Sequence, residues 1–153
     1  MLQRRFRMIE PIDETNLVEV LPLVRMYQEF YQVSNIDDVK NRAFFSQFGP
    51  GSDKGCLFGY RKGRELVAFA TVYFSYASSI TSKVGVMNDL FTLKDFRNQG
   101  IATELIKYCE NYAKSHGAVR LQWLASSTNK EAQSVYSSLG ATKSSWKLYT
   151  YAT

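Results

Sequence analysis

Residues 88–103 read Asn-Asp-Leu-Phe-Thr-Leu-Lys-Asp-Phe-Arg-Asn-Gln-Gly-Ile-Ala-Thr. A strand enters a loop here, and Gly100 begins a long run with helical periodicity. Backbone N–H groups are free at the start of a helix, and the helix dipole adds positive potential, so this turn favours phosphate. A glycine there lets a ligand approach the backbone closely. The pattern Arg-x-x-Gly-x-Ala also fits a plain strand–loop–helix turn.

The segments around this turn predict alternating strands and helices. Strands are expected at 5–10, 56–60, 66–76, 84–92, 119–125 and 143–151, and helices near 22–31 and at 36–48, 100–115 and 129–139. The first helix is expected to start near Pro22, after a cap at Asp13 or Thr15, and the second to be capped by Ser34 or Asn35. The order predicts one α/β domain with a mixed sheet, antiparallel in its first half and flanked by helices on both faces.

Apolar periodicity predicts which faces are buried. The strand at 66–76 is apolar on both sides, which is typical of a central strand. In the helix at 36–48 we expect Val39, Ala43 and Phe44 to form the buried stripe. The inward residues of the helix at 100–115 are expected to be Ile101, Leu105, Tyr108, Cys109 and Tyr112.

Composition excludes several classes of protein. The 153 residues are 45% hydrophobic and 22% charged, which is typical of one globular domain. The net charge of +5 is too small and scattered to indicate nucleic-acid binding. No apolar run is long enough for a membrane helix, and no apolar segment follows the basic N-terminus, so we expect a cytoplasmic protein. Two cysteines and one histidine predict neither a disulfide scaffold nor a metal site.

A second motif follows the strand at 119–125. Residues 129–141 carry the pattern Asn-x-x-Ala-x-x-x-Tyr-x-x-x-Gly-Ala, with Asn129, Ala132, Tyr136 and Gly140 in place. Together with Arg97, Gly100 and Ala102 in the earlier turn, the chain resembles the GNAT superfamily of acetyl-CoA-dependent N-acetyltransferases. Residues 86–141 match the superfamily best. Within it, residues 69–76, 88–92 and 146–149 resemble the diamine-acetyltransferase-like branch.

The resemblance implies acetyl-CoA as cosubstrate, no metal, and a binding core at about 84–141 within a single domain of residues 1–153. The pyrophosphate would lie on the turn, the pantetheine along the preceding strand, and Asn129 would bond the pantetheine or only cap its helix. The implied cosubstrate-binding residues are Leu90, Phe91, Thr92, Arg97, Asn98, Gln99, Gly100, Ile101, Ala102, Thr103, Asn129 and Tyr136.

The resemblance also implies Tyr136 as the general acid toward the CoA sulfur; the apolar stripe around it also fits a buried core tyrosine. The branch typically has a glutamate where this chain has Asn88, and an amide is no base. Asp89 is the nearest carboxylate and the candidate base, with Glu29 or ordered water as alternatives. The implied acceptor-binding residues are Glu29, Tyr31 and Asn88.

The implied function is direct transfer of an acetyl group, in a ternary complex, to a primary amine of a small molecule or peptide. The alternative is a weak or inactive CoA-binding regulatory module. We expect a homodimer, because the strand at 143–151 exposes many aromatic side chains unless a helix of the same chain covers them. No nucleic-acid or membrane partner is expected.

Overall fold

The computed structural model describes residues 8–153, in which a five-stranded sheet has the order β1-β2-β3-β4-β5. The strands are β1 (Ile9–Pro11), β2 (Gly55–Lys62), β3 (Glu65–Ala77), β4 (Ser82–Thr92) and β5 (Leu121–Gln122). The first four pair antiparallel, and β4 pairs with β5 in parallel. The predicted mixed sheet is therefore confirmed; residues 5–7 of the predicted first strand lie outside the described part.

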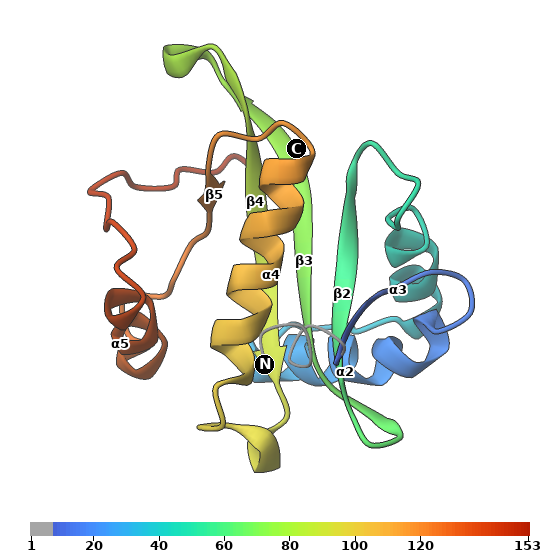
Figure 1. The fold of residues 1–153 in the computed structure, drawn as a ribbon. Coiled ribbons are helices and arrows are strands. Elements are labelled where there is room, and N and C mark those ends of the chain that lie inside the picture. The colour runs from blue at the N-terminus through green and yellow to red at the C-terminus, as the bar shows by residue number, and fades with distance from the viewer. Residues whose placement is uncertain (1–7) are drawn as a thin grey trace.

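Helices cover both faces of this sheet, as predicted (Figure 1). The α4 helix (Ile101–Ser115) packs on one face, and α2 (Leu17–Phe30) packs on the other beside α3 (Asp38–Phe45). A fourth helix, α5 (Lys130–Ser138), follows β5, and two short 3-10 turns lie at Ser78–Ile80 and Lys94–Phe96. Within residues 8–153, no helix is both long enough and apolar enough to cross a membrane.

Strand β3 is the centre of the core, as its two-sided apolar pattern predicts. Its residues from Leu66 to Val72 are all buried. On the α4 side, Val72 belongs to a cluster with Leu105 and Cys109, whereas Phe69 belongs to a second cluster with the residues of α2. The sheet is therefore held by a separate apolar layer on each face.

The first helix begins earlier than the sequence predicted. Helix α2 starts at Leu17 after Asn16, so Pro22 lies inside it. Proline has no N–H to offer the carbonyl four residues earlier. That carbonyl belongs to Val18, which is 61% exposed, so water can bond it. The expected cap at Asp13 or Thr15 is also wrong: Asp13 instead accepts hydrogen bonds from the N–H and hydroxyl of Thr15.

Helix α3 is shorter than predicted and presents another face to the core. Its cap is Asp37, whose carboxylate accepts from the N–H groups of Val39 and Lys40, so neither Ser34 nor Asn35 caps it. The expected stripe is wrong, because Val39 is 80% and Phe44 is 47% exposed while Phe45 is buried. The buried amide of Asn41 exchanges hydrogen bonds with Gln28 of α2, which fixes how α3 is rotated.

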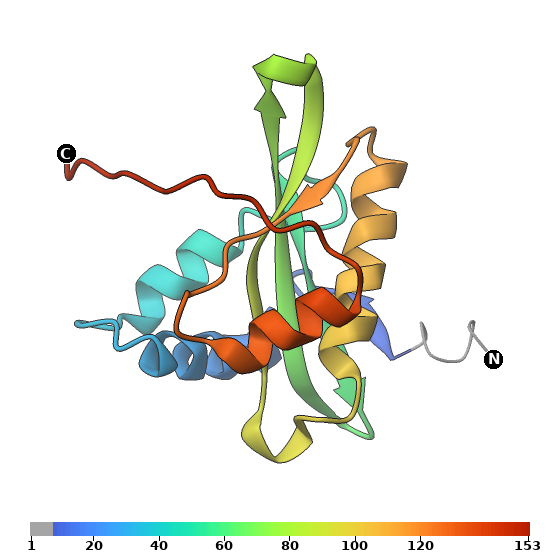
Figure 2. The same cartoon turned by 90° about the vertical axis from the view of Figure 1, so that its left-hand side faces the viewer.

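The predicted strand at 143–151 does not form. Residues 141–153 have no regular structure; after α5 they pass in front of the sheet in the view of Figure 2 and then extend beyond it to the C-terminus. Trp146, Leu148, Tyr149 and Tyr151 are 72% to 98% exposed, so no helix within residues 8–153 covers them. A strand needs a neighbouring backbone for its hydrogen bonds, and the structure gives this segment none. The predicted strand at 119–125 likewise shortens to the two residues of β5.

We predict that Phe69→Ala destabilises the fold by about 3–5 kcal/mol, because it empties a fully buried site between β3 and α2. Val39→Ala is the matched control: it removes apolar atoms from an exposed helix position, so its effect should stay within about 0.5 kcal/mol. Urea unfolding of both variants measures the difference. Similar losses in the two variants would contradict the assigned faces of the sheet and of α3.

Candidate functional site

The end of β4 is an unpaired strand edge on the side of β5. Strand β5 pairs only with Gly85 and Val86, whereas β4 continues to Thr92. The other edge of β4 is bonded to β3 as far as the pair Ala68–Thr92. The backbone groups of residues 87–91 on the side of β5, and the N–H of Thr92, are therefore open to an extended, amide-containing chain.

The turn after β4 presents backbone N–H groups. Asn98 and Gly100 have positive φ values of 62° and 80°, and α4 starts directly after Gly100. The helical hydrogen bonds begin with the N–H of Glu104, which bonds the carbonyl of Gly100 at 3.1 Å. The N–H groups of residues 101–103 precede that bond and lie at the positive end of the helix dipole. The turn thus has the geometry that anions prefer.

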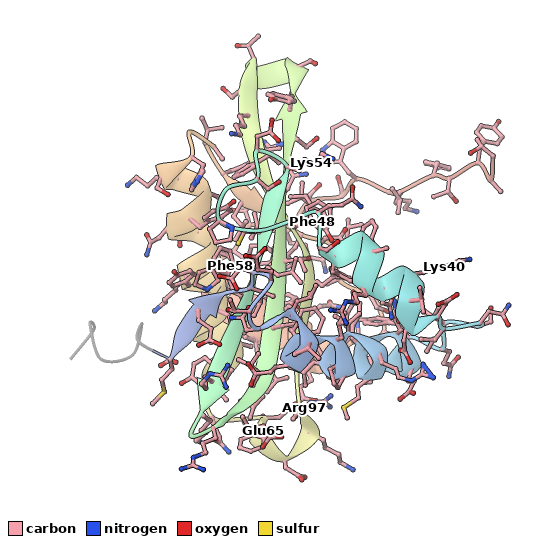
Figure 3. All side chains as sticks on the ribbon, turned by 90° about the vertical axis from the view of Figure 1, so that its right-hand side faces the viewer. Lys40, Phe48, Lys54, Phe58, Glu65 and Arg97 are labelled. Atoms are coloured by element: carbon pink, nitrogen blue, oxygen red, sulfur yellow. The ribbon has the colours of Figure 1, made fainter. Side chains whose placement is uncertain are left out.

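Arg97 braces this turn. Its Nε donates to the carbonyl oxygen of Thr92 at 3.0 Å, and its guanidinium lies 5.6 Å and 5.7 Å from the ring centres of Phe30 and Phe91. Figure 3 shows Arg97 at the lower end of the sheet, close to α2. The guanidinium therefore ties the end of β4 and the end of α2 to the turn.

Helix α5 supplies Asn129 and Tyr136. The Asn129 side chain accepts from the N–H of Ala132 at 3.2 Å, so it caps the helix. The Tyr136 ring meets Trp123 edge to face at 5.3 Å and packs against the core cluster on the α4 side. Burial raises the pKa of the Tyr136 phenol, and the neighbouring Tyr31 phenol raises it further, so Tyr136 carries its proton at neutral pH.

A β-bulge directs Asp89 toward α2. The register of β3 and β4 shifts by one residue, because Thr71 pairs with Asp89 while Val72 pairs with Met87. Asn88 is the extra residue, so Met87 joins the core on the α4 side while Asp89 faces the opposite way. Asp89 is 7% exposed and accepts from the hydroxyl of Thr71 at 2.5 Å and from the amide of Asn88 at 3.3 Å.

Sequence reasoning missed the residues that surround Asp89. Burial raises the pKa of Tyr27 strongly, and the nearby Asp89 carboxylate raises it further. Burial raises the pKa of Tyr73 to about 12, and the nearby Asp89 carboxylate contributes to this rise. The helical spacing of Tyr27 and Tyr31 indicated that they share one face of α2. Only the register of β3 and β4 shows that this face lies near Asp89.

The predicted acceptor residues separate into two groups. The Tyr31 ring lies 5.0 Å from that of Tyr27, and its phenol contributes to the raised pKa of Tyr136. Asn88 is exposed beside Asp89. Glu29 instead pairs with Arg25 at 3.6 Å on the exposed side of α2, and no contact joins it to Asp89.

The remaining reactive side chains lie elsewhere. Cys56 and Cys109 are buried, and burial raises the pKa of the Cys56 thiol to about 12, so neither is poised as a nucleophile. His116 lies at the far end of α4, where its ring stacks on Phe74 and is tilted against Tyr112. Among residues 8–153 there is no cluster of three or more histidine, cysteine or carboxylate side chains that could hold a metal ion.

Antiparallel strands, a short parallel pair and an anion-favouring turn at the start of a long helix therefore come together in one α/β domain. The family model of the acetyltransferase (GNAT) family matches residues 21–141, and the chain belongs to this family. The predicted family resemblance, fold class and acyltransferase activity are therefore confirmed.

Named relatives include N-acetyltransferases from bacteria and animals. The chain is 24% identical over 121 residues to an uncharacterised N-acetyltransferase, YhfO, of Bacillus subtilis, covering 79% of this chain and 80% of the relative. It is 26% identical over 136 residues to a thialysine N-epsilon-acetyltransferase of Mus musculus, covering 84% and 79% of the two chains.

Solved structures share the fold along almost the whole chain. The crystal structure of a probable acetyltransferase superposes with a TM-score of 0.82 at 26% identity, covering 95% of this chain and 97% of the other. An aminoglycoside N-acetyltransferase, AAC(6')-Iy, in complex with CoA superposes with a TM-score of 0.78 at 19% identity, covering 94% of this chain and 93% of the other. At that identity the likeness concerns the fold.

Proposed function

We propose that the protein transfers an acetyl group from acetyl-CoA directly to a primary amine of a small molecule or peptide within a ternary complex. The observation that carries this proposal is the open edge of β4 leading into the turn at Gly100. Residues 1–153 act as one domain, and residues 84–141 form its acetyl-CoA core. We place the protein in the cytoplasm.

The cosubstrate binds along β4 and at the start of α4. The pantetheine amides pair with the backbone of Leu90–Thr92, where β5 leaves the edge open, and one N–H there polarises the thioester carbonyl. The pyrophosphate lies on the N–H groups of residues 98–103. Arg97 shapes this turn through Thr92 rather than by reaching the phosphates. The side-chain oxygen of Asn129 caps α5, and its side-chain NH2 group donates a hydrogen bond to the pantetheine.

Tyr136 protonates the leaving thiolate. Its phenol is protonated at neutral pH because burial and Tyr31 raise its pKa, so it can donate a proton when charge develops on sulfur. In the balanced reaction, the ammonium nitrogen loses two protons as it forms the amide bond with the acetyl carbon, one to the base or water and one that balances the proton gained by sulfur when the carbon–sulfur bond breaks. Tyr136 supplies the proton for sulfur.

The acceptor approaches from the α2 side of β4. Asp89 is the carboxylate nearest to the open edge, with Asn88 exposed beside it and Tyr31 at the end of α2. We assign Asp89 to the removal of the ammonium proton, directly or through ordered water. Glu29 remains an outer acceptor contact, since it must leave Arg25 to reach inward.

The experiment that tests the proposal is a thiol-release assay with acetyl-CoA and a panel of primary amines. The panel contains alkylamines, diamines, amino acids, an aminoglycoside and short peptides. We expect saturable CoA release with at least one amine and the matching acetylated product by mass spectrometry. If acetyl-CoA binds but no amine causes release of CoA, the alternative of a CoA-binding regulatory module is favoured. That alternative is supported by Asn88, whose amide stands where the diamine-acetyltransferase-like branch typically has a glutamate.

Gly100→Val should abolish the micromolar binding of acetyl-CoA that we expect for the wild type. Gly100 has φ +80°, and a branched side chain would both strain the turn and stand where the pyrophosphate meets the backbone. Gly117→Val is a matched control, because Gly117 has φ +84° at the other end of α4 and is equally uncrowded. Isothermal calorimetry should find binding lost only in Gly100→Val; equal affinities in the two variants would contradict the phosphate turn.

Tyr136→Phe should lower kcat by ~10²- to 10⁴-fold while leaving the acetyl-CoA dissociation constant nearly unchanged, because a general acid acts in the transition state. The ring stays packed against Trp123, so the loss of stability should be about 1 kcal/mol. Tyr112→Phe removes a buried phenol outside the site and should keep full activity. A normal kcat with a lower melting temperature for Tyr136→Phe would make Tyr136 a core residue only.

We also propose a homodimer built with the segment after α5, whose exposed aromatic side chains have no cover in the described chain. Light scattering at tens of micromolar should give twice the 17.5 kDa chain mass. Trp146→Ser should shift the protein toward the monomer without lowering the stability of that monomer, because Trp146 is 93% exposed in the single chain. A monomeric mass for the wild type would reject the dimer.

A further inference from the structure

Helix α5 carries Asn129 at its start and Tyr136 in its last turn, but core packing holds this helix weakly. None of its residues, Lys130–Ser138, is buried, whereas α4 buries five side chains along its length. Figure 1 shows α5 at one side of the sheet, beyond β5. Tyr136 and the following Leu139 pack against the core cluster on the α4 side. An element with so few buried side chains is easily displaced unless a specific contact fixes it.

Trp123 supplies such a contact from the sheet. It follows directly after the last residue of β5, is half-buried and packs against the same core cluster as Tyr136. The two rings meet edge to face, with centres 5.3 Å apart and planes at 70°. Aromatic pairs favour this geometry. Among residues 8–153, no other pair of rings in contact includes Tyr136.

The connection between β5 and α5 does not fix the helix on the sheet. Residues 124–128 are all exposed. The side-chain amide of Gln133 donates to the carbonyl oxygen of Ser126 at 2.7 Å, which ties the start of α5 to this connection. Because Ser126 itself is exposed, that bond closes the connection onto α5 without joining either of them to the sheet. The direction of Tyr136 relative to the sheet therefore depends on its contact with Trp123.

We propose that Trp123 is a positioning residue for Tyr136 and holds its ring so that the phenol faces the sulfur of bound acetyl-CoA. The proposal rests on the proposed function and adds a residue to it. Trp123 contacts the ring of Tyr136 and not the reacting atoms, so it acts only through that tyrosine. A proton donor must lie within about 0.5 Å of its productive place, and a displacement of about 1 Å costs on the order of a hundredfold in rate.

The first test measures turnover with an amine that the thiol-release panel identifies as an acceptor. Trp123→Leu keeps apolar bulk but removes the ring. It should lower kcat by about ten- to a hundredfold, while the dissociation constant of acetyl-CoA stays within about twofold. Trp123→Phe keeps a ring at this place and should recover most of kcat. Phe74→Leu is the matched control and should keep the wild-type kcat, because Phe74 is a half-buried ring that stacks on Tyr112 at the other end of α4.

A double-mutant cycle separates positioning from a general loss of structure. In the Tyr136→Phe background no phenol remains to be positioned, so adding Trp123→Leu should lower kcat by less than about twofold. A structural role would instead lower kcat by the same factor in both backgrounds. Melting temperatures of Trp123→Leu and Phe74→Leu, measured alongside, compare the loss of stability that each missing ring causes.

The second test needs no turnover. Burial raises the pKa of the Tyr136 phenol, and the Tyr31 phenol raises it further. Carbon-13 labelling of tyrosine at the phenol carbon lets NMR follow this pKa, and the spectrum of Tyr136→Phe assigns the signal. Trp123→Leu should expose the phenol and lower its pKa toward the ordinary value of about 10. Phe74→Leu should leave the pKa of Tyr136 raised.

Either an unchanged kcat or an unchanged phenol pKa in Trp123→Leu would overturn the proposal. An equal loss of kcat in the wild-type and Tyr136→Phe backgrounds would overturn it as well, because Trp123 would then act without the phenol. Failure of the proposed acetyl transfer is a separate result, seen as absent thiol release by the wild type with every amine. In that case the phenol pKa alone decides whether Trp123 holds Tyr136.

Discussion

The parallel contact between β4 and β5 lasts for two residue pairs, Gly85–Leu121 and Val86–Gln122, and the site depends on its brevity. Had the pairing continued to Thr92, the backbone of β4 would be saturated along its whole length and closed to an amide-containing ligand. Because β5 ends at Gln122, the chain leaves the sheet there and carries Trp123 and then α5 to the far side of the opening. One early strand end therefore creates both the binding edge and the wall that holds Tyr136.

One extra residue in β4 then places Met87 and Asp89 on opposite faces of the sheet. Without the bulge at Asn88, alternation would put Met87 and Asp89 on the same face. With it, Met87 fills the core beneath α4, and Asp89 turns toward Tyr27 on α2. The carboxylate thus comes close to the open edge from the side opposite the helix that begins at the phosphate-favouring turn.

Sequence patterns predicted the elements that depend on local information. Period-two strands around the turn at 61–65, the helix starting after Gly100 and the cap at Asn129 all formed as expected, because propensity, turn chemistry and burial agree there. The strand predicted at 143–151 has the composition of a strand but lacks a partner, and composition alone makes no backbone hydrogen bond. The prediction of the buried face of α3 was wrong because apolar spacing does not set the rotation of this helix. The hydrogen-bonded pair Gln28–Asn41 sets it instead.

The candidate site was predictable only as separate pieces. Gly100, Asn129 and Tyr136 belong to recognisable motifs. The direction of Asp89 depends on a β-bulge, which the residue types of β4 do not predict. In the sequence, Tyr27 has no feature that distinguishes it from other half-buried helix residues. Only the register of β3 and β4 shows that Thr71 and Asp89 lie near it.

The two tyrosines at the ends of this arrangement connect its halves. Tyr31 follows the last turn of α2 beside Tyr27, and its phenol raises the pKa of Tyr136 on α5, the residue proposed as the general acid. An acceptor bound on one side and a thioester bound on the other would therefore meet between a carboxylate and a protonated phenol. Acetyl transfer from sulfur to nitrogen requires this order of groups. A negative charge favours the incoming ammonium, and a proton donor favours the departing thiolate.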